Sequence, residues 1–155
     1  MKRVLLAAVI LVVAVTGLAA ADGLRGSRVG LEFGNPGGVL IYRPRAFDFK
    51  LGYDLADNEY LYLSADYRII SGYQLVDFLH FFLGVGGYTG FYFDDREGDD
   101  GQFDLGAHIP VGLQAFLFGP TVELFIEVAP TVRFFPSIEA FQEFHGFIGF
   151  TILIK

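Results

Sequence analysis

The chain has 155 residues, which is enough for a single domain. It contains no cysteine, so disulfides and a lipid-modified N-terminal cysteine are both excluded. The formal net charge of −7 disfavours binding to nucleic acid, whose phosphates require a basic surface. Hydrophobic residues make up 53% of the chain, and lysine occurs only at Lys2, Lys50 and Lys155, which indicates that much of the surface does not face water.

The N-terminal segment has the features of a secretory signal peptide. A basic pair precedes an unbroken apolar run over residues 4–15, and Ala19 and Ala21 follow as a small-residue cleavage signal. A retained transmembrane helix is the alternative, but the apolar run is shorter than the ~20 residues that a membrane span requires. We therefore expect residues 1–21 to be cleaved and residues 22–155 to form one exported domain.

The rest of the chain is dominated by a period of two, which is typical of β-strands. Turn-forming residues divide it into runs that we expect to be strands. These runs cover residues 27–34, 39–42, 47–55, 60–70, 79–93, 103–118, 122–135 and 144–154. A sustained helical period is absent, and only residues 71–77 could form a helical turn. The pattern predicts an all-β fold, a single antiparallel up-and-down transmembrane β-barrel of about eight strands.

The connections are of two kinds. Residues 94–102 and 136–143 are expected to form longer outer loops, whereas 43–45 and 119–120 are expected to form short turns at the opposite end. Pro110 and Pro130 each remove a backbone donor from a strand, so each predicts a local bulge. The pairing of the first two, short strands stays open.

Alternation alone does not say which face is wet, because a soluble barrel has its apolar face inside and a membrane barrel has it outside. The polar phase is rich in glycine, which weakens an exposed strand but is useful inside a narrow barrel. Its charges, which include Arg28 and Glu32, are of both signs and could pair in an interior. We therefore expect the polar phase to line the interior. A soluble periplasmic carrier of a hydrophobic ligand is the alternative if the apolar phase is internal.

Most of the interior charges are expected to form a structural, charge-paired network that plugs the barrel. The residues of this predicted network are Asp48, Lys50, Asp66, Arg68, Asp104, Glu123, Glu127 and Arg133. A conduction path is the alternative interpretation, but a barrel of eight strands leaves no aqueous channel once its side chains are in place.

Six polar side chains on the interior phase could supply catalytic groups. They are Ser64, His80, His108, Glu123, Glu127 and His145. A Ser-His-Glu arrangement is conceivable by count, but no nucleophile motif accompanies these residues. The three histidines are too scattered for a metal site, and the acidic run at 94–101 lacks the register of a calcium loop. We therefore predict no catalytic residue, no metal and no cofactor.

Several segments resemble a family of small outer-membrane β-barrel proteins with the eight-stranded architecture of the OmpA transmembrane domain and OmpX. The segments are Leu83-Gly84-Val85-Gly86-Gly87, His108-Ile109-Pro110-Val111-Gly112-Leu113, Leu124-Phe125-Ile126-Glu127-Val128-Ala129-Pro130 and Gly146-Phe147-Ile148-Gly149-Phe150, with Ala65-Asp66-Tyr67 also fitting. The similarity extends over nearly the whole mature chain. It implies an eight-stranded barrel that the assembly machinery inserts into the outer membrane of a bacterium with two membranes, and it implies no particular activity.

Two functions of different classes follow from these expectations. The first is a structural or surface-interaction barrel, surrounded by outer-membrane lipid, whose loops at 94–102 and 136–143 contact an extracellular or envelope partner. The second is a lipid-modifying enzyme, a hydrolase or acyltransferase acting on lipid A, with its site at the barrel rim. Because no catalytic motif is found, the first function is the prediction.

Overall fold

The chain folds as a closed antiparallel ring of β-strands in this computed structural model, which describes residues 26–35, 37–54, 60–93 and 103–154. The expected signal peptide and the segment 94–102 lie outside the described residues. The strands are β1 (Ser27–Asn35), β2 (Gly37–Pro44), β3 (Phe47–Asp54), β4 (Tyr60–Val76), β5 (Leu79–Tyr92), β6 (Phe103–His108), β7 (Val111–Leu117), β8 (Val122–Phe135) and β9 (Glu139–Ile154). Within these ranges no helix is long and apolar enough to cross a membrane.

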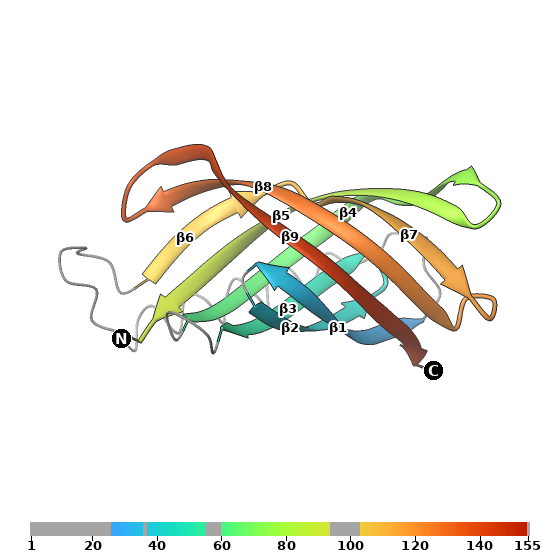
Figure 1. Cartoon of the computed structure of the whole chain (residues 1–155). Coiled ribbons are helices and arrows are strands. Elements are labelled where there is room, and N and C mark those ends of the chain that lie inside the picture. Colours follow the sequence, from blue (N-terminus) through green and yellow to red (C-terminus); the bar gives the residue numbers. More distant parts are fainter. Residues whose placement is uncertain (1–25, 36, 55–59, 94–102, 155) are drawn as a thin grey trace.

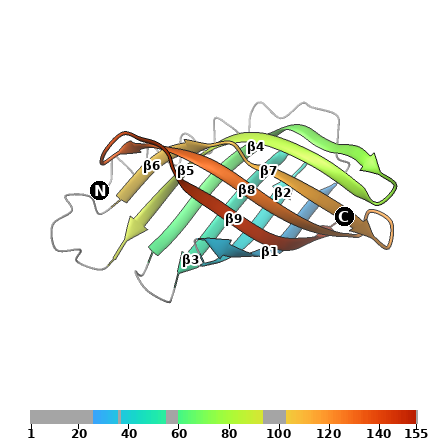
Figure 2. The ribbon, with the colours of Figure 1, turned by 45° about the horizontal axis from the view of Figure 1, so that its top comes forward.

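The ring is closed by pairing between the first and the last strand. Strands β1 to β5 pair in chain order, β8 pairs with β9, and β9 returns to pair with β1 (Figure 1). Strands β6 and β7 follow one another along the same path, and each pairs with β5 on one side and β8 on the other. The nine strands therefore fill eight positions around the ring. Figure 2 shows the ring from a second direction. The predicted all-β antiparallel arrangement is confirmed.

The break between β6 and β7 lies at Ile109 and Pro110, where the sequence predicts a bulge. The ladder is kept across it, because the Gly84 amide donates to the Pro110 carbonyl at 2.8 Å and the Ile109 amide donates to the Pro130 carbonyl at 3.2 Å. A register shift follows Pro130 in β8, so the second predicted irregularity is also confirmed. Each proline lacks an amide donor, and the strands accommodate this by a local shift without opening the ring.

The strands are staggered around the ring. Partner residues starting from Phe33 in β1 lead through β2, β3 and β4 to Phe91 in β5. In the other direction they lead through β9, β8 and β7 to Phe81 in the same strand, ten residues away. Because partner rows run across the strands, this stagger requires the strands to tilt against the ring axis, typically by about 35–45°. The β5 residue at the same height along the ring axis as Phe33 is therefore Gly86, midway between Phe81 and Phe91.

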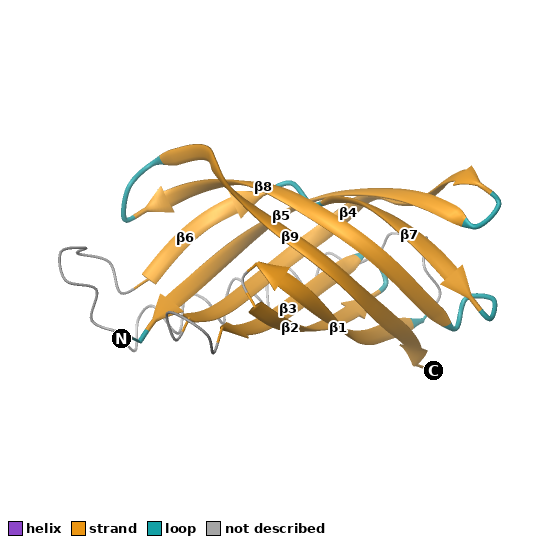
Figure 3. Ribbon diagram, in the orientation of Figure 1, coloured by secondary structure: helices purple, strands orange, loops and turns teal. Residues whose placement is uncertain are grey.

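The wall of the ring has unequal height. Strands β1, β2 and β3 have 9, 8 and 8 residues, whereas β4, β5, β8 and β9 have 17, 14, 14 and 16. Figure 3 shows β8 and β9 extending past the first three strands at one opening, and the hairpin of β4 and β5 extending past them at the other. We call β1, β2 and β3 the low wall.

Several boundaries differ from the sequence-based expectation, among them the ends of β2, which was expected over 39–42 and runs from Gly37 to Pro44. The expected break at 71–77 is wrong, because β4 continues to Val76 and turns only at Asp77 and Phe78. Three register shifts against β5 disrupt the period of two there, which is why this part of the strand resembles a loop. The expected loop at 136–143 is also too long, since β9 begins at Glu139.

The two phases of the strands face opposite sides of the ring. Large apolar side chains are exposed on the outside, for example Leu31, Val85, Ile126 and Ile148. Charged side chains from the same strands are buried inside, for example Glu32 in β1. The expected lining of the interior by the polar phase therefore agrees with the burial of these residues.

Candidate functional site: the buried polar interior

The predicted charge network is placed inside the ring with one partial exception. Asp48, Lys50, Asp66, Arg68, Asp104, Glu123 and Glu127 are all buried. Arg133 lies toward one opening of the ring, where 16% of its side chain is exposed. Because side chains alternate along a strand, these residues share one face of the sheet. Closure of the sheet places that face inside the ring, where residues from several strands meet.

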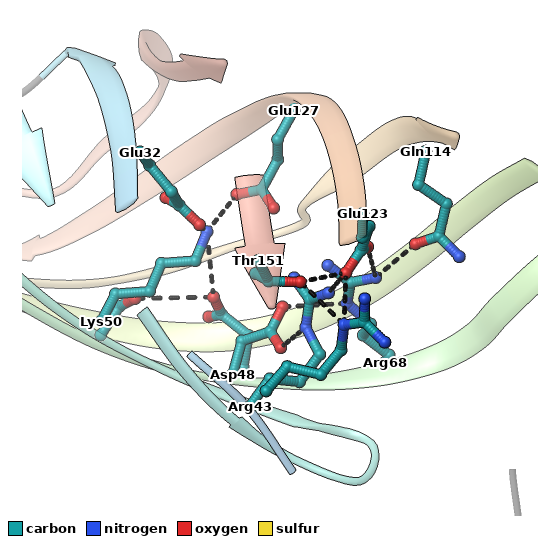
Figure 4. A network of polar contacts seen from close by, with 12 residues as sticks. Glu32, Arg43, Asp48, Lys50, Arg68, Gln114, Glu123, Glu127 and Thr151 are labelled. Carbon is teal, nitrogen blue, oxygen red and sulfur yellow. Dashed lines mark hydrogen bonds and ion pairs between the residues drawn. The ribbon is translucent and has the colours of Figure 1, made fainter. Parts of the chain in front are cut away.

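Glu123 in β8 forms ion pairs with arginine side chains from three other strands (Figure 4). Its carboxylate accepts hydrogen bonds from Arg43 in β2 and, at 2.6 Å, from the Thr151 hydroxyl in β9. The Nε atom of Arg28 lies 3.1 Å from one carboxylate oxygen, and Nη1 of Arg68 lies 3.6 Å from the other. One carboxylate therefore contacts side chains from four other strands across the interior.

Asp48 in β3 is the second anion of this group. It accepts hydrogen bonds from Nε of Arg43 and, at 2.9 Å, from Nε of Arg68. Nη1 of Arg68 also donates to the Gln114 side-chain oxygen at 2.7 Å, which extends the contacts to β7. We call Arg28, Arg43, Asp48, Arg68 and Glu123 the arginine cluster. It holds three arginines and two carboxylates, all buried.

A second group surrounds Lys50 and has the opposite balance. Its Nζ atom lies 2.5 Å from Glu127, 3.4 Å from Glu32 and 3.8 Å from Asp66. The other oxygen of Asp66 contacts Nε2 of His108 at 2.5 Å. In this lysine cluster, three buried carboxylates share one lysine and one histidine. Neither oxygen of Glu32 accepts a hydrogen bond from the described residues.

Every cation of these two clusters also lies over an aromatic ring, an arrangement that favours a desolvated cation. The distances to the ring centroids are 4.0 Å for Arg68 over Phe82, 5.0 Å for Lys50 over Phe147, 5.4 Å for Arg43 over Phe125 and 5.6 Å for Arg28 over Phe116. The interior therefore supplies both counterions and π-faces to its buried cations.

Glycines on neighbouring strands make room for these interior rings. A Cβ atom would lie 2.3 Å from the Phe82 ring at Gly112, 2.7 Å from the Phe125 ring at Gly149 and 2.6 Å from the Tyr88 ring at Gly106. Each of these glycines is the direct cross-strand partner of the aromatic residue. The glycine-rich character of the polar phase therefore has a steric cause in the interior.

An aromatic layer containing two histidines lies next to the lysine cluster. The His145 ring meets Tyr62 and Tyr88 edge-on, with centroids 5.1 Å and 4.9 Å away. Its Nδ1 atom lies 3.4 Å from the Tyr62 hydroxyl. The His108 ring stacks on Tyr88 at 5.5 Å. Both histidines are therefore packed as parts of the interior filling.

Ser64 is not hydrogen-bonded to a histidine in the contacts of the described residues, so it is not arranged as the nucleophile of a hydrolytic triad. The Ser64 hydroxyl contacts Asp66 at 3.5 Å, and His108 contacts the other oxygen of the same carboxylate. In a triad the serine hydroxyl is hydrogen-bonded to the histidine, so that the imidazole can take the proton of the hydroxyl. His80 lies apart, against the Phe116 ring at 5.3 Å. In the part of the chain that the structure describes, no group of three or more potential ligands is arranged to hold a metal ion.

Arg43 is a site residue that the sequence analysis missed, because it was assigned to a turn. Strand β2 instead runs through Pro44, so Arg43 continues the inward phase of Val39 and Ile41. The continued alternation was the available signal. The inward aromatic residues, such as Phe82 and Phe125, were missed as well, because apolar neighbours on both sides hide their phase.

One opening of the ring carries a smaller polar group around Arg133. This guanidinium contacts Glu139, lies 3.5 Å from Glu143 and lies 3.8 Å from Asp104. The Tyr92 hydroxyl donates to Asp104 at 2.6 Å. With three carboxylates around one arginine, the described part of this opening is acidic.

Comparison of the chain with models of protein families, with curated proteins and with solved structures finds no match in any of the three.

Proposed function

We propose that this protein is an integral outer-membrane β-barrel with a structural or surface-interaction role and an interior plugged by charge pairs. The observation that carries the proposal is the inverted polarity of the ring. Buried carboxylates, guanidiniums and the Lys50 ammonium lie inside, while exposed leucine, isoleucine, valine and phenylalanine side chains face outward.

An outward apolar face supports contact with lipid. A soluble protein rarely exposes a large contiguous apolar surface, whereas a membrane barrel requires an apolar band around its outside. A soluble carrier would require the reverse arrangement, with a polar outside and an apolar interior to hold its ligand. The burial of Glu32, Lys50 and Glu127 on the inside argues against a carrier.

The closed pairing of the strands supports the same proposal. In hydrocarbon each backbone donor and acceptor needs an internal partner, and a closed ring provides one without leaving sheet edges along the shared height of its strands. The pairing of β1 with β9 over residues Ser27 to Asn35 supplies this closure. The predicted signal peptide and the resemblance to small outer-membrane barrels support export to that membrane.

The filled interior supports a structural role and argues against conduction. The arginine cluster, the lysine cluster and the aromatic layer bridge opposite strands at short distances, as between Lys50 and Glu127 at 2.5 Å. A barrel with eight positions has an interior just wide enough for such side chains. Interaction with an extracellular partner is therefore assigned to the openings, where the acidic group around Arg133 lies.

Heat modifiability tests this proposal. Mature protein refolded in detergent is compared on an SDS gel with and without boiling, beside a test of its solubility in plain buffer. We expect a folded band that shifts on boiling, no solubility in buffer and no ionic conductance after insertion into planar bilayers. A freely soluble protein without a shift would contradict the membrane location, and stable conductance steps would contradict the plugged interior.

A further inference from the structure

The low wall is too short to match a bilayer of ordinary thickness. Strand β2 has 8 residues between two tight connections, since Gly37 pairs with Gly34 at one end and only Arg45 and Ala46 separate Pro44 from β3 at the other. At about 3.3 Å per residue it extends about 26 Å along its own direction. With the tilt expected of a closed ring it covers about 20 Å of the axis, less than the apolar band of about 25 Å in outer-membrane barrels.

The opposite wall is tall enough. Strand β5 has 14 residues, which correspond to about 46 Å along the strand and about 35 Å along the axis. Phe33 in β1 is level with Gly86, near the middle of β5, yet it is only two residues from the end of its own strand at Asn35. The low wall therefore ends, on this side, close to the level where the tall wall has its middle.

A flat bilayer centred on the tall wall would cover polar groups at the low wall. The Asn35 side chain would lie in hydrocarbon, where its single hydrogen bond to the Phe144 carbonyl is long, at 3.4 Å. Beside the low wall, β9 residues 139–145 have no partner on β1, and β4 residues 69–76 have none on β3, within the described pairing. Unpaired backbone groups are costly in hydrocarbon.

Tilting the whole ring does not remove this mismatch. A tilt moves the low wall up or down, but it does not lengthen β2, which has 8 residues where β5 has 14. Its exposed large apolar side chains are Leu40 and Tyr42 alone among the described residues of this strand. A bilayer adapts to a short apolar span by thinning locally, at a modest energetic cost.

We propose that the bilayer is thinned against the low wall, so that lipid headgroups and water reach the turn at Asn35 while the tall wall contacts hydrocarbon of full thickness. This inference rests on the proposed membrane location. It assigns the lipid itself as the occupant of the low wall, in place of a second copy of the chain or another protein.

The absence of tryptophan from the sequence allows a direct depth measurement. Phe33→Trp and Val85→Trp introduce single reporters at nearly the same axial level on opposite walls, both at outward-facing positions. Each variant is refolded into phosphatidylcholine vesicles whose acyl chains carry bromine either near the headgroup or near the chain end. We expect the tryptophan at position 85 to be quenched most by the deep bromines and the tryptophan at position 33 by the shallow ones, with a red-shifted emission.

The other outcomes separate the two proposals. Equal quenching of both reporters by the deep bromines would overturn the thinning. Deep quenching at position 85 with no quenching at position 33 would also overturn it, because another protein surface would then cover the low wall. Absence of quenching in both variants would overturn the membrane location itself. Heat modifiability verifies that each variant is folded, and Tyr53→Trp, on β3 at the same rim, provides a second reporter if Phe33→Trp does not refold.

Discussion

Buried charges inside the ring depend on particular partners, because a charge moved out of water is stable only if it is paired. Glu123 is the most heavily used anion, since Arg28, Arg43 and Arg68 all lie within ion-pair distance of it. Among the described residues, the Glu127 side chain forms an ion pair with Lys50 alone, and Lys50 also has Glu32 and Asp66 nearby. The two glutamates therefore differ in how many charges would lose a partner without them.

Replacing Glu123 by alanine tests this difference. We expect Glu123→Ala to lower the free energy of unfolding in detergent by about 3–5 kcal/mol, because it leaves buried arginines short of one carboxylate. Glu127→Ala should lower it too, by less, since Lys50 retains two carboxylates. Glu143→Ala, at the opening with 51% of its side chain exposed, is the matched control, with a loss of at most about 1 kcal/mol. Equal losses for all three variants, measured by urea titration, would contradict a buried network.

Neighbouring strands fit together through pairs of a large ring and a glycine. The Phe82 ring in β5 lies over Gly112 in β7, and the Phe125 ring in β8 lies over Gly149 in β9. Glycine is unfavourable inside a strand, so its repeated use opposite aromatic residues indicates a steric requirement. These pairs allow rings as well as charges to occupy a narrow interior.

Adding one methyl group at such a pair should be costly. The Cβ atom of Gly112→Ala would meet the Phe82 ring at 2.3 Å and a backbone oxygen of Ile126 at 2.2 Å. We expect a loss of about 1–3 kcal/mol in unfolding free energy, as for overpacking in other cores. Gly87→Ala is the matched control, because its new methyl group would face outward with its nearest neighbour at 3.5 Å. The idea fails if the two variants unfold at the same urea concentration.

The whole molecule is organised by the separation of its two faces. The interior holds the charges of the strands, and the outside presents side chains that water does not solvate well. In a soluble protein this arrangement would leave the apolar face exposed, whereas lipid would cover it. The same separation explains why lysine is so rare in the sequence.

The effect of one added charge on folding stability tests whether the outer face contacts lipid or water. Val128→Lys places an ammonium near the middle of β8 on the outside, at a side chain that is 53% exposed. In a bilayer we expect a loss of about 2–4 kcal/mol in folding stability there, against about 0–1 kcal/mol for Phe118→Lys in the turn after β7. Stability in vesicles would be measured by urea titration with tyrosine fluorescence. If Val128→Lys were neutral, the outer face would be in water.

Much of the fold was predictable because alternation is a local property. The strands over 27–34, 47–55, 79–93 and 122–135 were expected almost within their observed bounds. The two largest errors lie where alternation is disturbed or where a strand continues only because it pairs with another. Three register shifts hide the second half of β4, and the continuation of β9 back to Glu139 depends on pairing with β8 across a turn.

The sequence by itself determined that the strands have one apolar and one polar phase, because side chains alternate along a strand regardless of what surrounds it. The glycines and mixed charges of the polar phase predicted that it lies inside, but only the tertiary structure showed this, because the direction in which a sheet curves is a property of the closed ring. Closure of the ring also determines which buried charges become partners, since Arg43 and Glu123 are separated by 80 residues in the chain. The low wall has the same origin, because the shortness of β2 has consequences only beside the long strands that the stagger places opposite it.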